Sequence, residues 1–107
     1  MKYKILLTIL LSVLTTTNVL AKDLIIFTAS WCDPCKNLKK FISDNSTAKE
    51  YKELQILDIE KHQDEARKLG ITKVPTSIIF DDEGKLQSKK VGFSGSRSYD
   101  DWLQQNL

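Results

Sequence analysis

The sequence contains few residues that could bind a metal ion. Among its 107 residues there are two cysteines, Cys32 and Cys35, and a single histidine, His62. A structural zinc ion needs four ligands, usually supplied as two spaced pairs. We therefore expect no metal site within one chain and no organic cofactor. A metal ion shared between two chains is the remaining alternative.

Neither an excess of charge nor a repeated segment is present. The 16 basic and 14 acidic residues include Lys2 and Lys4 in the first segment, and without these two lysines the charges balance. Nucleic-acid-binding domains usually carry a basic patch or stripe, so neither nucleic acid nor a bilayer surface is an expected partner. Low-complexity tracts and linkers are also absent, and this length fits one domain with one core.

The chain also lacks an apolar run long enough to cross a membrane comfortably. The two early lysines precede the apolar residues 5–14, and the stretch then turns polar before it ends in Val19-Leu20-Ala21. A membrane span needs roughly 20 predominantly apolar residues, whereas this three-part layout is typical of a secretory signal. We predict that residues 1–21 are a signal peptide cleaved after Ala21, with an uncleaved membrane anchor as the alternative.

Cleavage would leave residues 22–107 as an exported domain that is not inserted in a membrane. Its location would be the periplasm in a Gram-negative cell and the extracellular space otherwise. Disulfides form and persist outside the cytosol, so the two cysteines are expected to meet each other there.

Apolar runs and helical spacing predict an α/β domain with the order β-α-β-α-β-β-α. Strands are expected at residues 24–27, 54–59, 76–80 and 86–91, the last two joined by the polar, glycine-containing residues 81–85. Helices are expected from Pro34 onward, at about residues 64–69 before Gly70, and after Ser98 as an N-terminal cap. This order favours a mixed sheet with helices on both faces.

Cys32 and Cys35 lie where the first strand gives way to the first helix. A helix N-terminus presents unpaired amide donors and a partial positive charge, which favour the thiolate of Cys32. Cys35 follows about one helical turn later, close enough to form a disulfide with Cys32. The pattern is typical of a redox motif in which Cys32 attacks and Cys35 resolves. A purely structural disulfide is disfavoured, because so short a ring removes little entropy from the unfolded chain.

The segment from Phe27 to Lys36, with Trp31-Cys32-Asp33-Pro34-Cys35 at its centre, resembles the active site of the thioredoxin family. Val74-Pro75-Thr76 resembles the cis-proline loop of that family, and Val91-Gly92 before a terminal helix resembles its closing segment. The resemblance covers essentially all of residues 22–107.

The resemblance implies a thioredoxin-like fold in which Pro75 is cis and its loop packs against the two sulfurs. Trp31, Asp33, Pro34, Val74 and Pro75 would then shape the site and bind substrate beside the catalytic cysteines. It also implies disulfide-bonded proteins as substrates, a membrane thiol-disulfide carrier as a candidate electron donor, and a monomer that needs no cofactor.

The sequence departs from the family pattern in four places. The strand and helix that usually open the fold are missing after cleavage, so the domain is a trimmed version. Ile26 stands where many members keep a buried Asp, so proton transfer at the resolving thiol must use water or another residue. Lys40 replaces a proline that often kinks the active-site helix. Asp33 places a carboxylate beside both sulfurs, which should disfavour the Cys32 thiolate and make the couple more reducing.

These features predict a thiol-disulfide oxidoreductase that exchanges disulfides with proteins and acts as a reductant. Two alternatives stay open. A glutaredoxin-like, glutathione-dependent reductase fits the short N-terminal side, although Gly92-Phe93-Ser94-Gly95 lacks the residues expected for glutathione binding. A redox-switched binding or metal-carrier module would use the same cysteine pair without turnover.

Overall fold

The computed structural model describes residues 22–107, and the predicted signal peptide lies outside the described residues. The strands are β1 (Asp23–Thr28), β2 (Glu53–Asp58), β3 (Thr76–Phe80) and β4 (Leu86–Val91), and the helices are α2 (Asp33–Asp44), α3 (Gln63–Lys68) and α4 (Ser96–Gln105). A 3₁₀ helix that the sequence pattern did not predict, η1 (Ala48–Glu50), precedes β2. The predicted order of strands and helices is confirmed.

The strands form one mixed four-stranded sheet in the order β2-β1-β3-β4. β1 is parallel to β2 and antiparallel to β3, and β3 is antiparallel to β4 across the predicted hairpin. A parallel pair needs a crossover connection, and α2 supplies it between β1 and β2. The cysteine pair therefore lies at the C-terminal end of β1, where the chain turns into α2.

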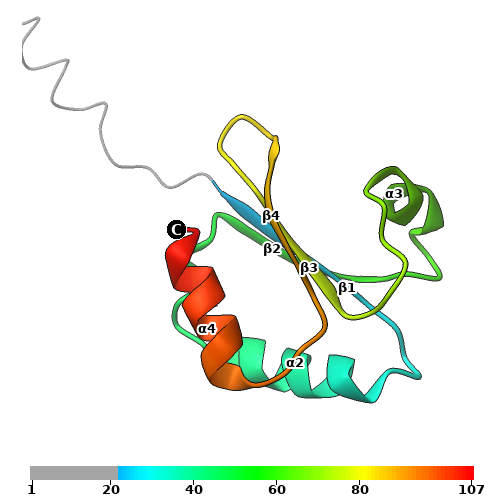
Figure 1. Cartoon of the computed structure of the whole chain (residues 1–107), viewed down its shortest axis with the longest axis horizontal. Coiled ribbons are helices and arrows are strands. Elements are labelled where there is room, and N and C mark those ends of the chain that lie inside the picture. The colour runs from blue at the N-terminus through cyan, green and yellow to red at the C-terminus, as the bar shows by residue number, and fades with distance from the viewer. Residues whose placement is uncertain (1–21) are drawn as a thin grey trace, which may run out of the picture.

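Helices cover both faces of the sheet, as predicted. α2 and α4 lie side by side on one face, while α3 covers one end of the other face (Figure 1). Leu24 and Ile26 point from β1 into the first layer, where they meet Leu38 of α2 and Leu103 of α4. Phe27 points into the second layer with Ala66 of α3. This alternation along β1 is the period of two that a strand buried on both faces requires.

The last helix begins three residues earlier than the sequence pattern predicted. Ser98 is not its N-terminal cap, because α4 starts at Ser96 and Gly95 occupies the cap position without a side-chain hydrogen bond. The Ser98 hydroxyl instead accepts a hydrogen bond from Lys90 Nζ at 3.2 Å. Gly95 has a φ of 143°, a conformation that glycine adopts at little cost, so the backbone turns into the helix there.

Gly70 ends α3 as expected. Its φ of 69° is in the left-handed region, and Ile71 N–H donates to the carbonyl of Ala66 at 2.9 Å as the helix closes. Within residues 22–107, no helix has both the length and the apolar composition that a membrane span requires.

Candidate active site

The local sequence sets up the N-terminus of α2 around Cys32. Cys32 is the cap residue, with an extended backbone at φ −100° and ψ 108°, and Pro34 lies in the first turn, where its missing N–H costs nothing. The backbone N–H of Cys35 donates to Cys32 Sγ at 3.2 Å. The sulfur of Cys32 therefore takes the place that an oxygen cap usually holds, in the field of the helix N-terminus.

The two cysteines form a disulfide, with their Cα atoms 5.3 Å apart. Cys32 is 5% exposed and Cys35 is fully buried. Ala29 is buried against them, and Ile59 and Val74 pack alongside. A partner sulfur can therefore approach Cys32 more readily than Cys35.

The loop before β3 packs against the disulfide, as the resemblance implied. The Val74–Pro75 peptide bond is cis, and the Pro75 side chain is fully buried. Gly92 N–H donates to the Pro75 carbonyl at 2.7 Å, and Thr76 Oγ1 donates to the carbonyl of Lys73 at 2.6 Å. These bonds hold the loop at both ends and keep Val74 beside the sulfurs.

Asp33 is the exposed charge nearest to the pair in sequence. Its carboxylate lies 3.7 Å from Lys36 Nζ, and the two side chains are 89% and 66% exposed. Solvent screens so exposed a pair strongly. This carboxylate was expected to disfavour the Cys32 thiolate. In the structure it forms an ion pair with Lys36, one turn further along α2.

The side chain of Trp31 does not cover the disulfide. Its side chain is 66% exposed, and the partly buried apolar residues that pack against the cysteines are Ile59 and Val74. The indole instead offers a large apolar surface next to Cys32. Such a surface is suited to contact with another molecule rather than to shielding the disulfide.

Ile59 is a residue of the site that sequence reasoning missed. Its local pattern shows only the end of the second strand. Because β2 runs parallel to β1, residues that follow both strands meet at the same edge of the sheet. The bond from Ile59 N–H to the carbonyl of Thr28, at 2.8 Å, fixes this placement.

Three further residues, His62, Ile26 and Trp102, are held by contacts within the fold. His62 is half-buried before α3, with Nδ1 3.2 Å from the carbonyl of Asp58, and no three His, Cys, Asp or Glu side chains converge within residues 22–107. Ile26 is fully buried among apolar residues. Trp102 packs on the core, and its Nε1 donates to Ser88 Oγ at 2.8 Å.

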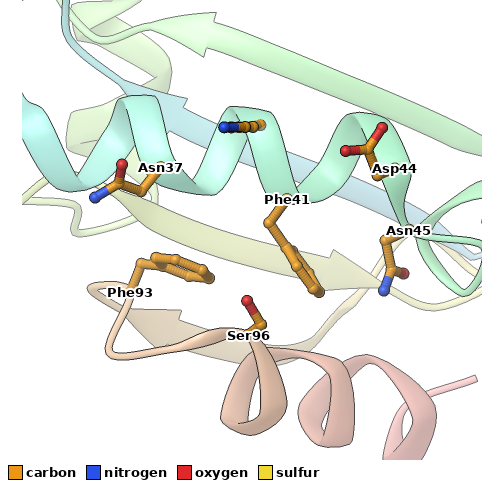
Figure 2. A pocket seen from close by; sticks show the side chains of 7 residues that line it. Asn37, Phe41, Asp44, Asn45, Phe93 and Ser96 are labelled. Carbon is orange, nitrogen blue, oxygen red and sulfur yellow. The ribbon is translucent and has the colours of Figure 1, made fainter.

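A pocket beside α2 does not include the cysteines. Figure 2 shows Phe41 on α2 facing Phe93, with Asn37, Asn45 and Ser96 around them. The rings of Phe41 and Phe93 lie 5.8 Å apart, and both contact the ring of Tyr99. The aromatic side chains therefore pack the junction between α2 and α4.

Comparisons with known proteins agree with this geometry. The family model for thioredoxin matches residues 15–105. A thioredoxin from Rickettsia bellii is 31% identical over 94 residues, which are 84% of this chain and 89% of the relative. A thioredoxin from Staphylococcus aureus is 31% identical over 86 residues, or 79% of this chain and 82% of that protein.

Solved thioredoxin structures have the same fold. A point-mutant thioredoxin from Halobacterium salinarum superposes with a TM-score of 0.68 at 26% identity, over 79% of this chain and 74% of that one. The thioredoxin of Malassezia sympodialis gives 0.67 at 24% identity with the same coverage and supports the fold alone. A Cys-x-x-Cys disulfide at the start of α2, within this fold, makes the protein a thiol-disulfide oxidoreductase, and the chain belongs to the thioredoxin family.

Proposed function

We propose that the protein reduces disulfides of exported proteins, with Cys32 as the attacking thiol and Cys35 as the resolving thiol. The observation that carries the assignment is the difference in setting between the two sulfurs. Cys32 is slightly exposed and accepts the Cys35 N–H at the helix N-terminus, whereas Cys35 is fully buried. The more accessible sulfur with the stabilised thiolate is the better nucleophile.

The reaction transfers two electrons from the dithiol to the substrate. The Cys32 thiolate attacks one sulfur of the substrate disulfide, so a mixed disulfide forms and the other substrate sulfur leaves as a thiolate that takes up a proton. Cys35, as a thiolate, then attacks Cys32 Sγ. This step releases the second substrate sulfur and forms the Cys32–Cys35 disulfide. A dithiol donor of lower potential, such as a membrane thiol-disulfide carrier, must then restore the reduced pair.

The Val74–Pro75 loop is the proposed docking site for the substrate chain. Among residues 22–107, no partner hydrogen-bonds the backbone N–H or C=O of Val74, which lies half-buried against the sulfurs. An extended substrate segment can bond these groups as a short added strand. Trp31 would supply apolar contact on the other side of Cys32, and Asp33 and Pro34 set the shape of the turn between the sulfurs.

The reducing direction is proposed from the charges around Cys32. A thiol couple becomes strongly oxidising when the protein stabilises its reduced form. Here one backbone amide points at Cys32 Sγ and can stabilise its thiolate, while Asp33, the residue after Cys32, adds a negative charge. We expect a potential near that of reducing family members, about −270 mV, rather than near about −120 mV. Titration against a glutathione buffer measures it, and a value near the oxidising end contradicts the proposal.

Trapping of the mixed disulfide tests the two cysteine roles. Reduced Cys35→Ser should accumulate mixed disulfides with insulin on non-reducing gels, because nothing resolves them, and Cys32→Ser should not. The double Cys32→Ser, Cys35→Ser variant is the control for background. Equal trapping by the two single variants would overturn the assignment. Steady insulin reduction by the wild type with a dithiol donor, but not with glutathione, separates it from the glutaredoxin-like alternative and from a binding module.

A further inference from the structure

A small pocket lies beside the Val74–Pro75 loop. The chain that leaves α3, the start of β3 and the last residues of β4 line it, and its volume is about 230 Å³. Sites for small organic ligands usually have volumes above about 300 Å³. This pocket therefore suits a single side chain of another molecule better than a cofactor.

Buried residues form the floor of this pocket, and exposed residues form its rim. Ile71 is almost completely buried, and Thr76 is fully buried, with its hydroxyl already bonded to the carbonyl of Lys73. Thr72, Lys73 and Lys89 line the same pocket and are exposed. A group that enters the pocket therefore meets the Thr72 hydroxyl and two ammonium groups.

The two charged residues that line the pocket are both lysines. Lys89 Nζ lies 3.3 Å from the carbonyl of Gly70 and 3.4 Å from that of Leu69, so the end of α3 holds this ammonium in place. An ammonium has three N–H donors, and these contacts leave one for a ligand. None of the three ion pairs within residues 22–107 includes Lys73 or Lys89. The pocket therefore presents positive charge that no carboxylate in this part of the chain pairs with.

We propose that this pocket is a subsite for an acidic side chain of the substrate, close in sequence to the cysteine that Cys32 attacks. The inference rests on the proposed docking of an extended substrate chain at Val74. Lys73 directly precedes Val74, so their Cα atoms lie about 3.8 Å apart. Extended residues rise about 3.3 Å each. An aspartate or glutamate within a few residues of the docked position can therefore reach the two ammonium groups.

The segment before Lys22 cannot supply this carboxylate. Residues 1–21 contain no aspartate and no glutamate, and their charged side chains are Lys2 and Lys4. Like charges repel, so the two lysines of the pocket disfavour these residues as its occupant. Charge complementarity thus selects an acidic side chain of another molecule.

Peptides with a single cysteine, joined by a disulfide to pyridinethiol, test the subsite. The Cys32 thiolate of the reduced protein should attack the peptide sulfur, because pyridinethiol has the lower pKa and is the better leaving group. A mixed disulfide with the peptide forms, and the released pyridinethiol reports the rate of attack. One series places a single glutamate at each position near the cysteine in turn, and the matched series places glutamine there.

The wild type should attack the best glutamate peptide about two- to fivefold faster than its glutamine match, the effect expected of exposed ion pairs. This preference should be largest at about 0.01 M salt and nearly absent at about 1 M, because salt screens exposed charges. Lys73→Gln should remove most of it. Lys73→Glu should reverse it and favour a peptide with lysine at that position. Lys39→Glu, the same charge change on the exposed side of α2, should keep the wild-type preference.

The ratio of the two rates separates the subsite from the reactivity of Cys32. A change in the thiol pKa alters the rates of both peptides alike, so only a contact with the varied peptide side chain alters their ratio. Lys89→Gln should lower this ratio as well. Because Lys89 also contacts the end of α3, thermal melts of each variant show whether the fold is intact.

Two results would overturn the subsite alone. Equal rates for glutamate and glutamine at every position would show that the wild type does not recognise an acidic side chain. A glutamate preference that persists in folded Lys73→Glu would place the acidic contact elsewhere. A wild type that releases no pyridinethiol from any peptide would instead contradict the proposed attack by Cys32, and the subsite with it.

Discussion

The carboxylate of Asp33, the residue after Cys32, belongs to an ion pair and is not an isolated charge. Asp33 faces Lys36 across one turn of α2, and both groups are largely in water. Each charge also acts on the Cys32 sulfur at the start of the helix. The carboxylate disfavours the thiolate there and the ammonium favours it, so the two effects oppose each other and solvent reduces both.

Asp33→Asn isolates the carboxylate. Loss of the negative charge should lower the thiol pKa of Cys32 by less than one unit and make the couple more oxidising by less than about 30 mV, the equivalent of one pKa unit for two electrons. Lys36→Gln should move both quantities the other way. Thiolate absorbance and titration against glutathione measure them.

A matched control for this pair lies in the β3–β4 hairpin. Glu83 lies 3.8 Å from Lys85 Nζ, and both side chains are exposed, so Glu83→Gln removes a similar charge far along the chain from the cysteines. It should change neither the thiol pKa nor the potential. Equal shifts in Asp33→Asn and Glu83→Gln would mean that net charge, and not position beside Cys32, sets the couple.

At the scale of elements, the hydroxyls of two tyrosines hydrogen-bond α4 to the rest of the fold. Tyr51, just before β2, donates to the carbonyl of Leu103 at 2.7 Å, and Tyr99 of α4 donates to Ser77 Oγ of β3 at 2.6 Å. Burial, with the Glu50 carboxylate adding to it, raises the pKa of Tyr51 to about 12. Burial likewise raises the pKa of Tyr99. In the folded chain, both hydroxyls therefore keep their protons at pH values at which an exposed tyrosine would ionise.

The raised pKa values of these two tyrosines predict a loss of stability at alkaline pH. The unfolded chain releases their protons near pH 10, whereas the folded chain retains them. The folded state then binds more protons, so the free energy of unfolding falls as the pH rises above about 10 and is independent of these groups below it. The limiting slope is about 1.4 kcal/mol per pH unit for each tyrosine. Urea unfolding between about pH 8 and about pH 12 measures it.

Tyr51→Phe separates this effect from the titration of lysines. Below about pH 10 it should lower the stability by about 1 kcal/mol, because the Leu103 carbonyl loses its partner. Above that pH it should flatten the alkaline slope, so that its difference from the wild type becomes smaller. A slope identical to that of the wild type would show that Tyr51 ionises normally in the folded protein.

At the scale of the whole molecule, we propose that the first 21 residues direct the chain out of the cytosol. If the signal is cleaved after Ala21, the intact mass of the exported protein should correspond to a chain that begins at Lys22. The thioredoxin match starts at residue 15 and therefore overlaps the last residues of the predicted signal. Mass spectrometry of the exported protein measures where the mature chain begins. Ala21→Tyr, which puts a bulky side chain at the cut, should slow processing. A wild-type mass that retains Met1 to Ala21, in the membrane fraction, would contradict cleavage.

The local sequence determined the elements and placed the cysteine pair at the start of a helix. Pro34 in the first turn and the spacing of Leu38 and Ile42 are enough to begin a helix beside Cys32, because helix starts depend on residues a few positions apart. The hairpin between β3 and β4 and the stop at Gly70 follow from equally local turn chemistry. For the same reason these features were predicted within a residue or two of their observed bounds.

Tertiary structure decided which distant residues meet. Ile59 lies beside the disulfide because β2 is parallel to β1, and no pattern around Ile59 specifies that pairing. Family resemblance, not composition, indicated that Val74 and Pro75 would reach the sulfurs. The edge position of β2 among residues 22–107 and the exposure of Trp31 depend on which surfaces other elements cover. Such contacts follow from strand register and packing across the whole chain, which a local stretch of sequence does not determine.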